Sequence, residues 1–295
     1  MGEPSEYSRK LVIGTASWGQ QYGLFNGSAA NTFEARNILS LALNSGITSL
    51  DTAPSYGKSE EIIGECGIPN LRVFTKLESS WLDKSLESVY EDIRSSLGRL
   101  GVSCLTGLTF HSAGSFFRDS RRALSLVSGA IHEGLVSEWG VSVYKTEEVE
   151  MLLEITNPNY IQAPVSIVDR RFIGDDISKK MLENSVKLQA RSVFLQGLIL
   201  NGVGRLPDHF SRFRGLFGTY ERIAESAGLS MLSLALMPIL SQKSVQSVVV
   251  GIHDFSQLEE LIDVMSFVGT GVDLESIPHC SDEDLVDPRR WPDFR

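Results

Sequence analysis

The chain has 295 residues, of which 42% are hydrophobic and 22% charged, and its formal net charge is −10. These fractions are typical of a globular protein with a large core, and the length fits either two domains or one α/β barrel. The acidic balance argues against a general nucleic-acid binder and against binding to an anionic membrane, since both partners require a basic face.

The ends of the chain and its cysteines indicate a cytoplasmic protein. Residues 1–10, MGEPSEYSRK, lack the apolar segment of a signal peptide, and no run of about 18 apolar residues follows anywhere. Cys66, Cys104 and Cys280 are odd in number and widely spaced, which predicts neither a disulfide framework nor a metal site. Free thiols of this kind are usual in a reducing compartment.

Short β-rich segments alternate with longer segments of helical spacing along the whole chain. Strands are predicted at 11–16, 47–51, 71–77, 105–111, 138–143, 160–166, 187–193 and 245–251. Helices are predicted between them, for example at 32–46, 82–101 and 120–134, the first of these capped by Asn31 with Glu34 and ended at Gly46. Such alternation implies parallel strands with crossover helices. Eight units at this length favour an α/β fold of the closed (β/α)₈ barrel type over an open sheet.

We expect residues 1–295 to form one barrel domain, because no repeat or low-complexity linker divides them. The segment 196–216 is long and rich in glycine, and long segments without regular structure are usually functional or mobile. From about residue 268 the chain is acidic and rich in turn-forming residues. This tail is predicted to be loosely structured apart from Trp291.

Polar side chains stand at the ends of three predicted strands. Asp51 ends the second strand, Lys76 lies near the end of the third, His111 ends the fourth, and Tyr56 follows in the loop after the second. Each alone has an ordinary structural explanation, such as a helix cap or a solvent-facing lysine. Together they should converge at one mouth of the barrel, because active sites of parallel barrels form at the carboxyl ends of the strands.

This combination suits the chemistry of a carbonyl group. A buried Lys76 needs an anion, which Asp51 supplies, and a nearby ammonium lowers the pKa of a phenol from its reference near ~10. Tyr56 then becomes a better proton donor near neutral pH, and His111 can donate a hydrogen bond to the same substrate oxygen.

The sequence offers no protein nucleophile, since it contains neither a G-x-S-x-G elbow nor an H-E-x-x-H motif. A hydride cofactor would supply one. No G-x-G-x-x-G follows the first strand, so this cofactor would lie across the barrel mouth and not in a Rossmann site. Two alternatives stay open: a Schiff-base aldolase that uses Lys76, and a cofactor-binding regulatory barrel with little turnover.

Several segments resemble the aldo-keto reductase superfamily, and in particular its bacterial members. The main match is GITSLDTAPSYGKSEEIIGE, at residues 46–65, continued by VFTKL and LTFHSAG. Weaker matches are GTASWGQQYG near the start, EWGVSVY, YIQAPVSIVDRR, ARSVFLQGLIL and SVVVGIHDFSQLEEL. The resemblance covers roughly residues 10 to 266.

The resemblance implies a role for each matching residue. Tyr56 would donate the proton, Asp51 and Lys76 would tune the acidity of Tyr56, and His111 would orient the carbonyl. Eight further positions would bind a nicotinamide cofactor: Ser142 and Gln162 at the nicotinamide, Ser192 and the backbone around Leu195, Gly197 and Leu198 at the pyrophosphate, and Gly251 and Gln257 at the adenosine.

Some positions depart from the family pattern. Val143 replaces an asparagine, Arg191 stands where an aromatic residue often stacks under the nicotinamide, and Leu261 replaces an asparagine at the adenine end. Asp254 is expected where neutral or basic residues often face a 2′-phosphate. The superfamily leans towards NADP(H), which is therefore the predicted cofactor. These departures keep NAD(H) as the alternative.

The expected partner is a small-molecule carbonyl substrate, with no nucleic acid and no membrane, and the sequence leaves the oligomeric state open. Candidates for the pocket walls are Trp18, Tyr22, Trp81 and Phe116. Candidates for contact with an anionic substrate are Arg118, Arg170 and Arg171.

Overall fold

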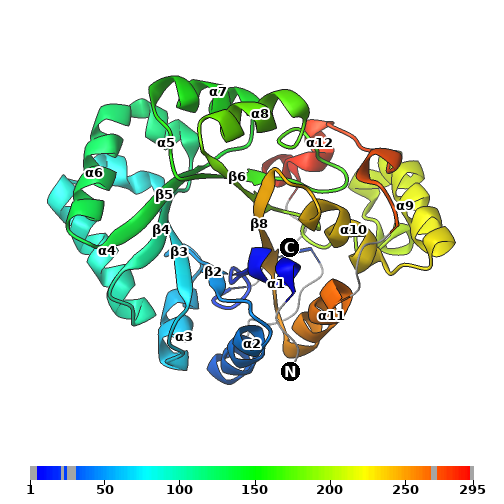
Figure 1. Ribbon diagram of the computed structural model, residues 1–295, viewed down its shortest axis with the longest axis horizontal. Coiled ribbons are helices and arrows are strands. Elements are labelled where there is room, and N and C mark those ends of the chain that lie inside the picture. Colours follow the sequence, from blue (N-terminus) through cyan, green and yellow to red (C-terminus); the bar gives the residue numbers. More distant parts are fainter. Residues whose placement is uncertain (1–4, 21–22, 25–30, 267–270, 293–295) are drawn as a thin grey trace.

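The computed structural model describes residues 5–20, 23–24, 31–266 and 271–292. Its strands are parallel and close into a barrel in chain order, with β8 paired to β1 (Figure 1). The strands are β1 Leu11–Gly14, β2 Ser49–Asp51, β3 Arg72–Leu77, β4 Leu105–Phe110, β5 Val136–Ser142, β6 Tyr160–Pro164, β7 Lys187–Arg191 and β8 Val245–Gly251. The predicted (β/α)₈ barrel is confirmed.

Helices surround the strands on the outside of the barrel (Figure 1). The α-helices are α1 Glu6–Lys10, α2 Thr32–Asn44, α3 Ser59–Cys66, α4 Leu86–Leu100, α5 Ala113–Arg118, α6 Ser120–His132, α7 Thr146–Ile155, α8 Asp175–Glu183, α9 Arg214–Ala227, α10 Met231–Leu240, α11 Phe255–Ser266 and α12 Glu283–Val286. The 3₁₀ helices are η1 Ser79–Asp83, η2 Val203–Arg205, η3 Asp208–Phe213, η4 Leu274–Ser276 and η5 Pro288–Arg290.

Local sequence explains where the crossover helices begin and end. The Asn31 side chain accepts from the backbone N–H of Glu34 at 3.0 Å and caps α2, as the sequence predicts. Ser85 caps α4 in the same way, and α4 ends at Gly101, whose φ of 67° is left-handed. The buried residues of these helices, such as Ile38 and Leu39 in α2 and Val89 and Ile93 in α4, belong to the hydrophobic core.

The strand register brings the predicted polar residues to one end of the barrel. Asp51 pairs with Phe74, two residues before Lys76, and Lys76 pairs with Thr109, two residues before His111. The backbone N–H of His111 also donates to the carbonyl of Leu77, which continues the pairing beyond β4. Neighbouring strands thus deliver their polar ends to the same mouth.

The C-terminal tail does not match the expectation of a loose segment over residues 271–292. It contains three short helical turns, η4, α12 and η5, and it buries Leu274, Ile277, Leu285 and Val286. The Tyr220 hydroxyl donates to the carbonyl of Pro278 at 2.8 Å, which fastens the tail to α9. These apolar anchors are spread among turn residues, so no local pattern in the sequence reveals them.

The segment 196–216 likewise has more structure than its sequence suggests, because it includes η2 and η3. Within the described residues, no single helix is long and apolar enough to cross a membrane, although the bent pair Asp208–Ala227 and Met231–Leu240 meets the criterion on length and composition alone.

Candidate active site

An ion pair lies at the base of the barrel mouth. Nζ of Lys76 is 2.5 Å from Oδ2 of Asp51, and both side chains are almost completely buried. The same ammonium donates to the carbonyl oxygen of Thr52 at 2.9 Å. Burial of this pair is tolerable because each charge has a partner and further hydrogen bonds.

Tyr56 stands over this ion pair. Nζ of Lys76 lies 4.8 Å from the centroid of the Tyr56 ring, and the ring of His111 lies 6.4 Å from it at a T-shaped angle. The four residues that the sequence predicted to converge do so. A single cavity is lined by all of them, so that one ligand can reach them together.

A close backbone contact fixes the loop that carries Tyr56. A Cβ placed at Gly19 would lie 1.9 Å from the carbonyl oxygen of Tyr56, so this position requires glycine. On the other side of the loop, the Ser59 hydroxyl donates to Oγ1 of Thr15 at 2.7 Å. The segment after β1 therefore packs directly on the Tyr56 loop and holds it at the mouth.

The electrostatics of Tyr56 differ from the sequence expectation. Burial raises the pKa of the Tyr56 phenol, and this effect outweighs the opposing influence of the Lys76 ammonium, so that the net pKa lies above 10.0. The expected fall below the ordinary value does not occur in the structure, because the ring is too deeply buried. Tyr56 therefore stays protonated at neutral pH and holds a proton that it can give away.

Lys76 remains charged. Burial acts to lower the pKa of its amine, but the neighbouring Asp51 and Tyr56 raise the pKa further, and the net shift is upward from 10.5. An amine must be neutral to attack a carbonyl carbon. The surroundings of Lys76 thus work against the Schiff-base alternative.

The second oxygen of Asp51 is also occupied. Nε2 of Gln162 donates to Oδ1 of Asp51 at 2.7 Å and to Oε1 of Gln189 at 2.7 Å. Both donors of the Gln162 amide are therefore committed within the protein, and its own carbonyl oxygen is the group left for a ligand. Gln189, in the predicted strand 187–193, is not among the site residues that the sequence predicts.

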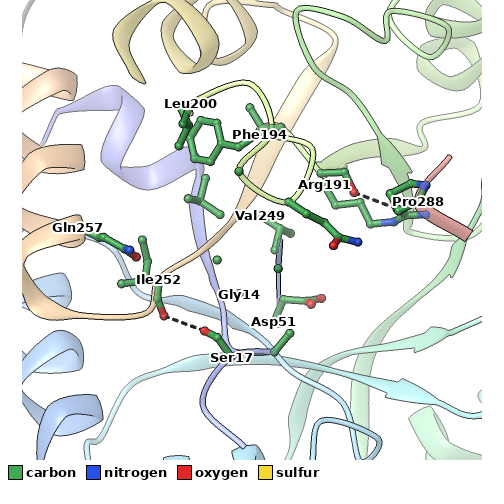
Figure 2. Close-up of a pocket in the computed structure, with 18 of the residues that line it drawn as sticks. Gly14, Ser17, Asp51, Arg191, Phe194, Leu200, Val249, Ile252, Gln257 and Pro288 are labelled. Carbon is green, nitrogen blue, oxygen red and sulfur yellow. Dashed lines mark hydrogen bonds between the residues drawn. The ribbon is translucent and has the colours of Figure 1, made fainter. Parts of the chain in front are cut away.

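The cavity at the mouth has a volume of about 780 Å³ and extends well beyond the tetrad. In Figure 2, Asp51 points into it, Arg191 and Pro288 lie on one side, and Gln257 lies on the opposite side. Six of the eight predicted cofactor residues line this cavity: Ser142, Gln162, Ser192, Gly197, Gly251 and Gln257.

The other two, Leu195 and Leu198, do not line it. Each side chain is 1% exposed and belongs to the core, and each backbone N–H already donates within the loop. Their neighbours Phe194 and Leu200 face the cavity instead (Figure 2). The loop that the resemblance names therefore lines the cavity, although the backbone N–H groups of Leu195 and Leu198 are engaged within the loop itself.

This loop after β7 has an unusual backbone. Ser192, Leu195 and Gln196 have φ values of 60°, 46° and 53°, and Gly197 follows at 89°. Left-handed conformations are rare for residues other than glycine, and they gather at binding sites where the surrounding structure enforces them. The loop thus carries strain at the wall of the cavity.

Two further features of the cavity suit a long ligand with phosphate groups. A Cβ built on Gly251 would meet no atom within 4 Å, so the end of β8 leaves open space against the cavity. Ser230, the N-cap of α10, lines the cavity together with Met231 and Leu232 of the first turn, and helix N-termini favour anions.

A second cavity of about 330 Å³ adjoins the first and shares His111, Ser142, Tyr144 and Arg289 with it. It is also lined by Glu78, Ser112 and Glu148. His111 therefore stands between a large cavity and a small polar one. A substrate in the small cavity would contact the same ring that a ligand in the large cavity reaches.

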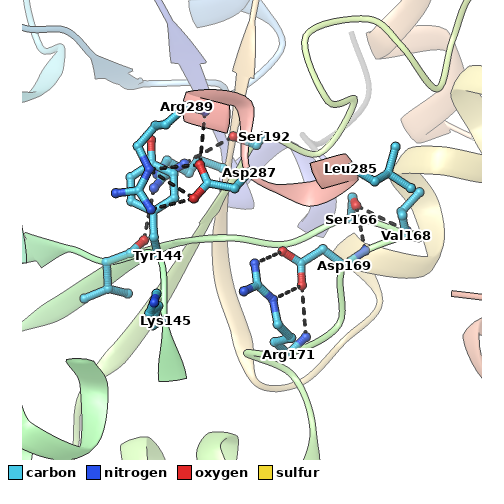
Figure 3. Close-up of polar contacts among 12 residues, drawn as sticks. Tyr144, Lys145, Ser166, Val168, Asp169, Arg171, Ser192, Leu285, Asp287 and Arg289 are labelled. Carbon is cyan, nitrogen blue, oxygen red and sulfur yellow. Dashed lines mark hydrogen bonds and ion pairs between the residues drawn. The ribbon is translucent and has the colours of Figure 1, made fainter. Parts of the chain in front are cut away.

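The C-terminal tail forms one wall of both cavities. The guanidinium carbon of Arg289 lies 3.4 Å from the centroid of the Tyr144 ring, and that of Arg191 lies 4.1 Å from the same ring. Asp287 holds Arg289 in an ion pair at 2.6 Å (Figure 3). Sequence reasoning missed Tyr144 and Arg289 because they meet only in the folded chain.

Most of the residues proposed as pocket walls lie elsewhere. Trp18, Trp81 and Phe116 are buried in the core and line neither cavity, and Tyr22 lies outside the described residues. Trp18 instead donates its indole N–H to the carbonyl of Ile252 at 2.8 Å.

The three arginines proposed for substrate binding, Arg118, Arg170 and Arg171, line neither cavity. Arg171 is paired with Asp169 at 2.7 Å, and Arg170 donates to backbone carbonyls, including that of Ile277 in the tail. Arg170 and Arg171 thus have structural roles in the loop after β6.

The end of the large cavity away from the tetrad is acidic. Glu260 lines it, whereas Asp254 does not: its carboxylate accepts from the backbone N–H of Gln257 at 2.9 Å and caps α11. Among the described residues, the lysines and arginines that line the cavity are Lys76, Arg191 and Arg289. Lys76 and Arg191 lie beside Tyr56 and Tyr144, and Arg289 covers the outer face of Tyr144.

Comparison with known proteins identifies the family of the chain. The model of the aldo/keto reductase family matches residues 10–282. The chain belongs to the aldo/keto reductase family. Among curated relatives, the uncharacterized oxidoreductase YqkF of Bacillus subtilis (strain 168) is 26% identical over 254 residues, which is 78% of this chain and 81% of that protein.

Solved structures of the family share the fold. Aldo-keto reductase AKR11C1 from Bacillus halodurans, in its holo form, superposes with a TM-score of 0.72 at 19% identity over 88% of this chain and 87% of that one. An aldo/keto reductase from Klebsiella pneumoniae, solved with NADP and acetate, superposes with a TM-score of 0.69 at 19% identity. The match covers 96% of this chain and 92% of that one. The recognised superfamily is thus confirmed, and the chain is an oxidoreductase by family.

Proposed function

We propose that this aldo/keto reductase reduces an aldehyde or ketone to an alcohol with a nicotinamide cofactor, and that Tyr56 donates the proton. The observation that carries the proposal is the position of Tyr56. It stands between the buried Lys76–Asp51 pair and the ring of His111, and it lines the large cavity, which shares His111 with the small one.

The protein's part in the reaction follows from these positions. His111 and Tyr56 present their polar groups to a carbonyl oxygen at the junction of the cavities, which orients the substrate. Charge that develops on this oxygen is stabilised by the Lys76 ammonium through Tyr56, in a buried site where electrostatic interactions are strong. As the oxygen becomes basic, Tyr56 gives up its proton to it.

The residues present fit a dinucleotide. When bound, the cofactor supplies the hydride for the carbonyl carbon. Ser142 and the Oε1 atom of Gln162 would hold its nicotinamide end, because they line the cavity beside the tetrad. The loop at Ser192–Gly197 and the start of α10 would hold the phosphates, and Gly251 and Gln257 would face the adenosine end.

We propose that the protein discriminates only weakly between NADPH and NADH. The nicotinamide end must reach Tyr56, which leaves the opposite end of the cavity for the adenosine ribose. A 2′-phosphate there would meet Glu260, and the phosphate is best bound by arginine or lysine. A carboxylate can instead accept hydrogen bonds from a free ribose hydroxyl.

A titration tests the function directly. NADH and NADPH are titrated against the protein by fluorescence, and each complex is then offered a panel of aldehydes, aldoses and keto-sugars. Cofactor binding with turnover of at least one carbonyl supports the proposal. Binding without turnover favours the regulatory barrel, and borohydride trapping of a substrate on Lys76 would favour the aldolase.

A further inference from the structure

A carboxylate stands directly behind the histidine of the site. Oε1 of Glu78, just after β3, lies 2.8 Å from Nδ1 of His111, just after β4. The hydroxyl of Ser55 donates to the same Oε1 at 2.6 Å. In the described part of the chain, Nε2 of His111 has no hydrogen-bond partner, and the ring lines both cavities.

The charge on Glu78 decides which ring nitrogen carries the proton. Burial acts to raise the pKa of Glu78, but the hydrogen bonds from His111 and Ser55 and the charge of Lys76 outweigh it, and the net pKa lies below 4.5. Glu78 is therefore ionised at neutral pH, and an ionised carboxylate can only accept hydrogen bonds. Nδ1 of His111 must then be the donor.

We propose that Glu78 is a positioning residue that fixes the proton of His111 on Nδ1, so that His111 assists carbonyl reduction only as the doubly protonated ring. This inference rests on the proposed function. With Nδ1 as the fixed donor, the neutral ring presents a lone pair at Nε2, which a carbonyl oxygen cannot use. Nε2 becomes a donor only when the ring takes up a second proton.

The reverse reaction, oxidation of an alcohol, needs the neutral His111 ring. The hydroxyl of an alcohol can donate to the Nε2 lone pair of the neutral ring, so the neutral ring suits alcohol oxidation. The same Glu78–His111 pair therefore favours reduction in acidic solution and oxidation in alkaline solution. Without Glu78, a neutral ring could place its proton on Nε2 and assist reduction at any pH.

Other charged and titratable groups surround this pair from each neighbouring element. They are Asp51 and Tyr56 in and after β2, Lys76 in β3, Tyr144 and Glu148 at the start of α7, and Arg289 in η5. Glu148 is the useful comparison, because it lines the same small cavity and accepts from the backbone N–H groups of Tyr144 and Lys145 at 2.7 and 3.0 Å. It has no hydrogen bond or ion pair with His111.

The test uses Glu78→Gln with Glu148→Gln as the matched control. A glutamine amide can donate to Nδ1, which allows the proton of the neutral ring to move to Nε2. Long-range ¹H–¹⁵N NMR spectra identify the protonated nitrogen, and the signals of His111 are assigned with a His111→Asn variant. At about pH 9 we expect Nδ1–H in the wild type and in Glu148→Gln, and a large Nε2–H population in Glu78→Gln.

Catalysis gives the second measurement, with benzaldehyde and benzyl alcohol as probes in the two directions. The wild-type kcat/KM for reduction should fall as the pH rises, and in Glu78→Gln this fall should shrink by about tenfold or more. Glu148→Gln should keep the wild-type pH dependence, whatever its effect on KM. The proposal is overturned if Glu78→Gln lowers kcat/KM for reduction equally at every pH. It is also overturned if the neutral His111 ring of the wild type carries its proton on Nε2. If no carbonyl of the wider panel turns over either, the proposed function fails, and the NMR result still decides the role of Glu78.

Discussion

Nζ of Lys76 and Oδ2 of Asp51 lie 2.5 Å apart beneath the ring of Tyr56, and both side chains are almost completely buried. The Lys76→Met variant keeps an unbranched side chain and removes one charge. It should abolish turnover and lower the free energy of unfolding by roughly 3–5 kcal/mol, because it leaves a buried carboxylate without its partner. Denaturant unfolding and steady-state assays measure the two effects.

The double variant Asp51→Asn/Lys76→Met separates these effects. With both charges removed, much of the stability should return while turnover stays lost. A single Lys76→Met protein with wild-type turnover and an unchanged pH profile would show that Lys76 does not act on Tyr56.

Replacement of Tyr56 by phenylalanine removes the proton donor and keeps the shape of the ring. We expect kcat to fall by about 10²–10⁴-fold, the usual effect of losing a positioned acid, with nearly unchanged cofactor affinity. Fluorescence titration of NADH and NADPH serves as the control for folding and binding. Turnover close to that of the wild type would remove Tyr56 from the mechanism.

The fold and the tetrad could be predicted because their signals are local. Each β-rich segment is marked by its own apolar residues, and Asp51, Lys76 and His111 each stand at the end of such a segment. Parallel strands must deliver their ends to one mouth, so the meeting of these residues follows from the strand order alone.

Parts of the site that depend on distant segments could not be predicted in the same way. Arg289 reaches Tyr144 only because Leu285 and Val286 anchor the tail, and these anchors follow no periodic pattern. Glu78 could have been identified from one feature of the sequence. It lies two residues after Lys76, a spacing that places both side chains on the same face of an extended strand.

The position of Arg289 on the Tyr144 ring should depend on pH, because Asp287, in the same tail, holds the guanidinium in place. Burial acts to raise the pKa of Asp287, but its bonds with Arg289 lower it more, and the net pKa lies below 3.8. A carboxyl group with a lowered folded-state pKa stabilises the fold above its unfolded-state value, and this contribution is lost as the pH falls through the folded-state pKa. The tail should therefore loosen only below about pH 4.

Trp291 reports this change, since its ring lies 4.9 Å from that of Phe210 at the base of the tail. The acid-dependent part of the tryptophan fluorescence should be present in the wild type and absent in a Trp291→Phe variant. Asp287→Asn should already show the loosened signal at pH 7. An identical acid transition in wild type and Asp287→Asn would mean that this ion pair does not fasten the tail.

Arg289 should affect substrate binding more than cofactor binding, because it lines the small cavity beside His111 and covers one face of Tyr144. In Arg289→Met, the long side chain keeps its packing on the ring and loses its charge. We expect KM for carbonyl substrates to rise severalfold and the dissociation constant of NADH to change little. Arg290→Met, at an exposed neighbour that lines neither cavity, is the matched control.

The acidic far end of the large cavity makes a prediction about cofactor choice. Glu260 lines this end, and the lysines and arginines that line the cavity lie beside Tyr56 and Tyr144 instead. A preference for NADPH over NADH should therefore stay below about 100-fold, equivalent to ~2.7 kcal/mol. Glu260→Gln removes the charge that would repel a 2′-phosphate, so it should tighten NADPH binding and leave NADH binding unchanged or weaker.

Glu259→Gln, next to it on α11 but outside the cavity lining, is the control. Fluorescence titrations of both reduced cofactors decide the matter: equal effects of Glu260→Gln on NADPH and NADH would place the ribose elsewhere.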